Sequence, residues 1–196
     1  MSKQVEFYFD VGSPASYLAW TQIRSLAERH GAEVLFQPML LGGVFKATGN
    51  SSPATVPAKG AYTRVDFQRF ARRYGVPFAH NPFFPINTMQ LMRGAVAYLD
   101  DERFLPYLEA VFQAMWVDGR DMGNPEVVAQ VLGAKGLDPE QLTEKISDAG
   151  VKDRLRQITE RAIERGVFGA PTFFVGDEMF FGQDRLDFVE EALAAD

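Results

Sequence analysis

Strand-like patterns occur near both ends of this 196-residue chain, and a long helical block separates them. Near the N-terminus, alternating residues 5–11 and the apolar run 32–40 indicate two strands, with a helix over 14–29 between them. Near the C-terminus, "PTFFV" and "EMFF" flank a Gly-Asp turn, which is typical of a hairpin, and a helix over 185–194 follows. Without the block, the two ends form a compact α/β unit of order β-α-β plus β-β-α.

The block itself is predicted to be almost entirely helical after a loop rich in Gly, Ser and Pro over 49–60. Two of its helices begin with an Asn-Pro or Asp-Pro pair, in which the side-chain oxygen caps the helix and proline fills the first position. The expected helices cover residues 61–74, 87–99, 102–117, 125–134, 139–147 and 151–165. We therefore divide the chain into a discontinuous domain, 1–48 with 167–196, and a helical insertion, 49–166.

Charge and composition argue against several classes of function. The net charge is −6 and no long Lys/Arg run is present, which argues against nucleic acid as a partner. No stretch reaches the ~18 apolar residues of a membrane span, and no charged-then-apolar leader precedes the first strand, so a cytoplasmic protein is expected. The chain has no cysteine and two well-separated histidines, so neither thiol chemistry by the protein itself nor a metal site is expected.

The turn between the first strand and the first helix, "DVGSPASY", raises the question of what Ser13 does. It has the layout of a redox Cys-x-x-Cys corner in which hydroxyls replace both sulfurs. Ser13-Pro14 is also the same cap-plus-proline device that opens two later helices. A hydrolase nucleophile is not favoured, because there is no Gly-x-Ser-x-Gly motif and no histidine nearby in the sequence. A helix cap and a catalytic group both stay open for Ser13.

Three separated features, taken together, resemble one family. They are the strand, Ser13-Pro14-Ala15-Ser16 and helix; "FGAPTFFV", in which Pro171 directly precedes a strand; and "GDEMFFGQDRL", which closes the hairpin. Their order resembles the thioredoxin fold, and the helical insertion resembles its DsbA-like branch. The amino-acid sequences of both end motifs are similar to those of the 2-hydroxychromene-2-carboxylate isomerases, which are relatives of the kappa-class glutathione transferases. The resemblance covers essentially the whole chain.

The resemblance implies a glutathione-dependent isomerase in which Ser13 is catalytic and Pro171 is cis. The glutathione-binding positions of the family map onto Asn50, Lys59, Ala170, Pro171, Gln183 and Asp184. Lys46 matches a position that contacts the organic substrate. The stretch that lines the substrate site matches residues 81–90, and it carries Phe83 and Phe84 where some relatives have a Tyr. Because relatives are dimers, a homodimer is expected.

Several residue roles have simpler alternatives. Asp184 stands where it would cap the last helix, Lys59 and Lys46 would be ordinary exposed lysines, and Asn50 would support its own turn. For the whole chain, one alternative is a kappa-like glutathione transferase or peroxidase that uses the same site. A second is a redox-dead thioredoxin-like binding protein without small-molecule chemistry.

Overall fold

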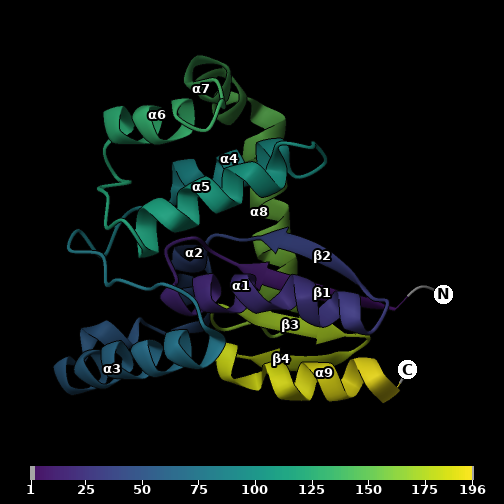
Figure 1. The fold of residues 1–196 in the computed structure, drawn as a ribbon. Helices are drawn as coiled ribbons and strands as arrows, with labels where there is room; N and C mark the ends of the chain where they lie inside the picture. The colour runs from purple at the N-terminus through teal and green to yellow at the C-terminus, as the bar shows by residue number, and fades with distance from the viewer. Residues whose placement is uncertain (1–2, 196) are drawn as a thin grey trace.

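A computed structural model describes residues 3–195 and confirms the thioredoxin-type order with a helical insertion (Figure 1). Four strands form one sheet in the order β2-β1-β3-β4. Strand β1 (Gln4–Phe9) pairs in parallel with β2 (Glu33–Pro38) and antiparallel with β3 (Thr172–Val175). Strand β3 forms a hairpin with β4 (Glu178–Phe181). The two ends of the chain therefore share one sheet.

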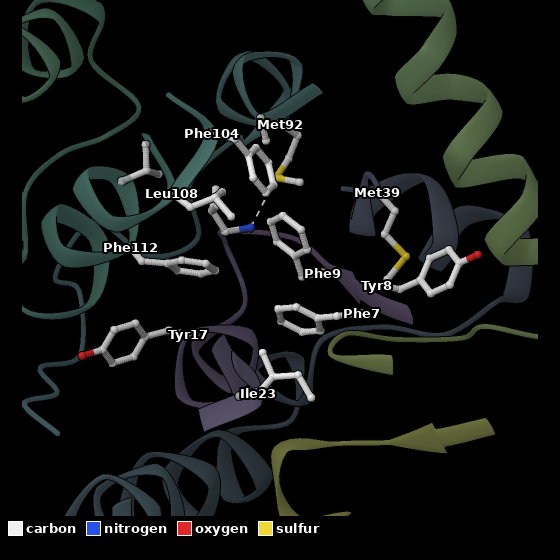
Figure 2. Packing of buried hydrophobic residues seen from close by; sticks show 14 of the residues in the cluster. Phe7, Tyr8, Phe9, Tyr17, Ile23, Met39, Met92, Phe104, Leu108 and Phe112 are labelled. Carbon is white, nitrogen blue, oxygen red and sulfur yellow. Dashed lines mark hydrogen bonds between the residues drawn. The ribbon is translucent and has the colours of Figure 1, made fainter. Parts of the chain in front are cut away.

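The core lies on both sides of β1, because successive side chains of a strand point to opposite faces. Phe7 and Phe9 point toward Ile23 and Phe112, while Tyr8 points the other way (Figure 2). These side chains are fully buried. The packing fixes the C-terminal end of β1, where the Ser13 turn begins.

Helix α1 (Pro14–Arg29) matches its predicted range, and α9 (Leu186–Ala195) packs against both α1 and β3. Helix α8 (Ala149–Glu164) contacts β2 and α4, so it touches the sheet as well as the insertion. The remaining helices of the insertion are α3 (Pro57–Tyr74), α4 (Met89–Tyr98), α5 (Phe104–Trp116), α6 (Pro125–Gly133) and α7 (Pro139–Ser147). Within residues 3–195, none of the helices is long and apolar enough to cross a membrane. The division into two domains stays a prediction.

Three local predictions were wrong. Helix α2 (Leu41–Thr48) was not predicted, since its Gly42-Gly43 pair has low helix propensity. The stretch 49–60 is not all loop, because Pro53–Thr55 form a 3-10 turn and α3 already begins at Pro57. At the C-terminal end, a 3-10 turn (Gln183–Arg185) precedes α9. Asp184 lies inside that turn and therefore does not cap the last helix.

Candidate active site

Ser13 is the N-cap of α1, and its hydroxyl makes two hydrogen bonds. Ser13 Oγ accepts the backbone N–H of Ser16 at 3.1 Å and donates to the carbonyl oxygen of Ala170 at 3.0 Å. The residue is 5% exposed. The cap predicted from the Ser-Pro pair is confirmed, and the single hydroxyl proton points across to the C-terminal half of the sheet.

The segment that faces Ser13 runs from residue 168 to 171, and its Ala170–Pro171 peptide bond is cis, as the resemblance implied. Asn50 Nδ2 donates to the Phe168 carbonyl at 2.8 Å. Thr172 Oγ1 donates to the Gly169 carbonyl at 2.9 Å, and the Gly182 N–H donates to the Pro171 carbonyl at 3.0 Å. Because Ser13 donates to Ala170, each of the four carbonyls of the segment accepts a hydrogen bond. These four hydrogen bonds fix the shape of the segment.

Asn50 belongs to this junction although it lies more than a hundred residues away in the chain. Besides its bond to Phe168, its Oδ1 accepts the Ser51 N–H at 2.8 Å, so it also supports its own turn. The side chain is exposed. The structure therefore brings Asn50 to the segment that contains Ala170 and Pro171.

Gln183 is buried, and its backbone carbonyl accepts a hydrogen bond from the hydroxyl of Tyr74 at 2.6 Å. This bond connects the C-terminal end of α3 to the 3-10 turn that precedes α9. Burial, together with the charges of Asp187 and Asp184, raises the pKa of Tyr74 to about 12. Asp184 itself is exposed, and its carboxylate accepts Arg185 Nη1 at 2.9 Å.

The two candidate lysines are exposed. Lys46 is in the last turn of α2, and Lys59 is in the first turn of α3. Tyr74 is fifteen residues beyond Lys59 on the same helix, which separates the two by about 22 Å at 1.5 Å per residue. Lys59 and the Tyr74–Gln183 contact therefore lie at opposite ends of α3, which extends away from the sheet (Figure 1).

The stretch 81–90 places its two phenylalanines differently. Phe84 is half-buried and packs against Trp116 at 5.9 Å and His80 at 5.7 Å between ring centroids, whereas Phe83 is 51% exposed. Burial and the charge of Arg64 lower the pKa of His80. Trp116 also donates its Nε1–H to the Val11 carbonyl at 2.8 Å, which links this aromatic cluster to the Ser13 turn. Phe83 and Phe84 were predicted to line the substrate site, whereas His80 and Trp116 were not.

Asp10 was not singled out from the sequence, because strand alternation placed it simply on the less apolar face of the first strand. The structure buries it to 2% exposure, and burial raises the pKa of its carboxyl. Three groups donate to that carboxylate, and they are described below. In the described part of the chain, residues 3–195, no three His, Asp or Glu side chains are placed to hold a metal ion.

These features define a thioredoxin-fold protein in which hydroxyls stand where the redox corner would carry thiols. The sequence profile of the DSBA-like thioredoxin domain matches residues 4–194. A curated Pseudomonas putida protein named 2-hydroxychromene-2-carboxylate isomerase is 35% identical over 96% of this chain and 93% of its own length. The chain belongs to the DsbA-like thioredoxin family and, within it, to the 2-hydroxychromene-2-carboxylate isomerases.

Two further comparisons agree with this placement. A solved structure of a 2-hydroxychromene-2-carboxylate isomerase superposes with a TM-score of 0.88 at 33% identity, covering 98% of this chain and 95% of the other. Glutathione S-transferase kappa 1 of Caenorhabditis elegans is 29% identical over 97% of this chain and 90% of its own length. The chain is thus similar to isomerases and kappa transferases over nearly its whole length.

Proposed function

We propose that this chain is a glutathione-dependent isomerase that interconverts 2-hydroxychromene-2-carboxylate and trans-o-hydroxybenzylidenepyruvate, or a related aromatic α-keto acid. The observation that carries the proposal is Ser13, which lies at the N-terminus of α1 and donates to the carbonyl that precedes cis-Pro171. Isomerases of that name match the chain over nearly its full length.

The N-terminus of α1 suits a thiolate. A free thiol has a pKa of about 8.5, so little of it is ionised at neutral pH. A helix N-terminus stabilises an anion by up to ~2 kcal/mol, and a hydrogen bond to a charged group contributes ~1.5–3 kcal/mol. The helix and the Ser13 hydroxyl together would make thiolate the main form of a sulfur bound there.

Ser13 would have to redirect its single proton for this purpose. That proton is now donated to the Ala170 carbonyl. If the hydroxyl turns toward a sulfur, the Ala170 carbonyl loses its donor and becomes free to accept a backbone N–H from an extended peptide. The cysteinyl residue of glutathione carries both the sulfur and such an N–H. The residues present therefore fit the tripeptide at its centre.

The outer groups of glutathione would meet the exposed polar candidates. Asp184 would pair with the γ-glutamyl ammonium in exchange for Arg185, and Lys59 would pair with a carboxylate of the tripeptide. Asn50 and Gln183 would support the backbone contacts from either side of the 168–171 segment. These roles are part of the proposal.

Bound glutathione would supply a thiolate for reversible addition to a conjugated carbon, which would let the former double bond rotate and would return the thiol unchanged. The chain's own residues would hold the substrate for this step. Lys46 would bind the carboxylate, and Phe84, which rests on Trp116, would pack against the aromatic ring. Phe83, being exposed, would close over the ring from the solvent side.

A kappa-like glutathione transferase is the second candidate, and the similarity to the Caenorhabditis elegans kappa protein favours it. It would use the same thiolate but would consume glutathione. We also propose a cytoplasmic location. We further propose a homodimer, whose mass light scattering on the purified chain would measure.

Calorimetry with glutathione, followed by a spectral assay of hydroxychromene carboxylate with and without it, tests the proposal. Glutathione binding and glutathione-dependent isomerisation are expected. Failure of the wild-type chain to bind glutathione would contradict both the isomerase and the transferase.

A further inference from the structure

Three helices begin around one buried carboxylate, that of Asp10. Its Oδ1 accepts the N–H of Gly12 at 2.9 Å, two residues before α1 begins. Its Oδ2 accepts the N–H of Leu41, the first residue of α2, at 2.9 Å. The same Oδ2 accepts the hydroxyl of Thr88, the residue before α4, at 3.1 Å.

One of these helices, α2, lacks a local cap, because the residue before it is Leu40, which has no side-chain acceptor. At α4, Thr88 donates its hydroxyl to Asp10, and the N–H of Met89, the first residue of the helix, donates to Asn87 Oδ1 at 3.0 Å. By contrast, α6, α7 and α8 are capped by Asn124, Asp138 and Asp148. Since α4 has a local acceptor in Asn87 and other helices have local caps, a shared buried carboxylate does more than replace a missing cap.

The positive ends of the helix dipoles explain how this carboxylate can be buried without a cation. Within the part of the chain that the structure describes, Asp10 forms no ion pair with Lys, Arg or His. Burial raises the pKa of Asp10, and the three donors oppose that rise. Because the buried Asp10 carboxylate depends on these three hydrogen bonds, it holds the three donor groups in a defined arrangement.

The three segments joined at Asp10 are those from which the proposed site is built. The first carries Ser13, the second is α2 with Lys46 and the turn at Asn50 beyond it, and the third, at Thr88, lies within the stretch 81–90. The Ser13 turn also contacts α4 through the Val11 N–H, which lies 3.3 Å from the sulfur of Met92 (Figure 2).

Close approach at this junction has left no room for a side chain at Gly12. A Cβ there would lie 2.7 Å from Cγ2 of Thr88, which is closer than real Cβ contacts. The Ser13 turn and the residue that precedes α4 are thus packed directly together, beside the carboxylate that both contact.

We propose that Asp10 is the positioning residue of the active site. Through Gly12, Leu41 and Thr88 it fixes where Ser13, α2 and the substrate-binding stretch lie relative to one another, without itself touching glutathione or the organic substrate. The inference rests on the proposed function and adds the residue that assembles that site.

The first test compares Thr88→Val with Thr88→Ser. Valine keeps the shape and removes the hydroxyl, whereas serine keeps the hydroxyl and removes a methyl group. A positioning role predicts that Thr88→Val raises KM for the organic substrate by about fivefold, while Thr88→Ser stays within about twofold of wild type. A pure packing role predicts the reverse order, with serine the worse variant, and that result would overturn the inference.

The second test uses Asp10→Asn and measures amide hydrogen exchange without ligand. Because an amide can accept at only one of the two positions, Gly12 or Leu41 loses its acceptor, so exchange at that amide should accelerate about tenfold or more, and the Kd for glutathione should rise by a similar factor. Asp148→Ala is the matched control: it removes an exposed cap that belongs to another helix, α8, and should change neither quantity. Should Asp10→Asn fail to fold, the Thr88 pair still decides.

The two failures can be told apart. Wild-type glutathione binding combined with unchanged exchange and unchanged Kd in Asp10→Asn would overturn the positioning role and leave the proposed function intact. Accelerated exchange at either amide in Asp10→Asn, with no glutathione binding by the wild type, would support the junction and overturn the proposed function.

Discussion

At the scale of single residues, Ser13 shows how one side chain can serve two purposes. Its oxygen accepts from Ser16, which is the work of a cap, and its proton goes to Ala170. The acceptor side stabilises α1, while the donor side is the one that a sulfur would recruit. A cap and a catalytic group are therefore compatible readings of Ser13, because they use different parts of the same hydroxyl.

The neighbouring phenylalanines give a prediction at the same scale. Phe84→Ala should raise KM for the aromatic substrate by about tenfold, since it removes the ring that rests on Trp116 and lines the proposed site. Phe83→Ala should raise it by about threefold or less, because half of Phe83 already faces solvent. Steady-state kinetics of both variants checks the order, and a larger effect at Phe83 would contradict the assignment.

At the scale of elements, α3 contacts α1 and is also attached at its C-terminal end. Its C-terminal end is attached by Tyr74, whose hydroxyl donates to the Gln183 carbonyl. Ionised Tyr74 would lose that bond and would face the charges of Asp187 and Asp184. The attachment of α3 beside the proposed glutathione site therefore depends on a neutral tyrosine.

This attachment predicts a specific loss of stability at alkaline pH. The pKa of Tyr74 is about 12 in the folded protein against 10.0 in the unfolded chain, so its contribution is complete below pH 10 and is lost as the pH rises toward 12. Tyr74→Phe should be less stable than wild type at pH 8, and the difference should shrink between pH 10 and 12. Urea unfolding across that range measures it, and a difference that stays constant with pH would contradict the account.

Local signals account for the elements that were predicted well. Helix α1 matched its range because Ser13-Pro14 marks its start and Gly31 follows its end. Helix α2 could not be predicted in this way, because its first N–H is satisfied by Asp10 from the end of β1. The burial of Asp10 has the same origin: it comes from α2 and Thr88, which approach only after the chain has folded.

At the scale of the whole molecule, the candidate site is assembled from distant parts of the chain. The cis bond at Pro171 was implied by the family resemblance, and the structure contains it. The Ser13 contact with Ala170 was not predicted, because it depends on how the two ends of the chain meet. The aromatic contact between Phe84 and Trp116 had no local signal, since it depends on how the insertion folds back over the Ser13 turn. The sequence therefore predicted the Ser13 and Pro171 motifs better than it predicted the aromatic residues that line the site.

Also at the scale of the whole molecule, one prediction distinguishes an isomerase from a glutathione transferase. An isomerase returns glutathione after each turnover, so a substoichiometric amount should support many turnovers, with the free thiol concentration unchanged at the end. Thiol titration during the spectral assay measures this. Loss of one thiol per substrate converted would instead identify a transferase.

The most direct measurement is an ultraviolet pH titration of glutathione bound to wild type and to Ser13→Ala. The account predicts a bound thiol pKa well below 8.5 in wild type and a value higher by about 1–2 units in the variant, since a hydrogen bond to the charged sulfur is lost. Ser13→Ala should also lose about 1 kcal/mol of stability as a missing cap. An equal thiol pKa in both proteins would leave Ser13 a helix cap alone and would contradict the account.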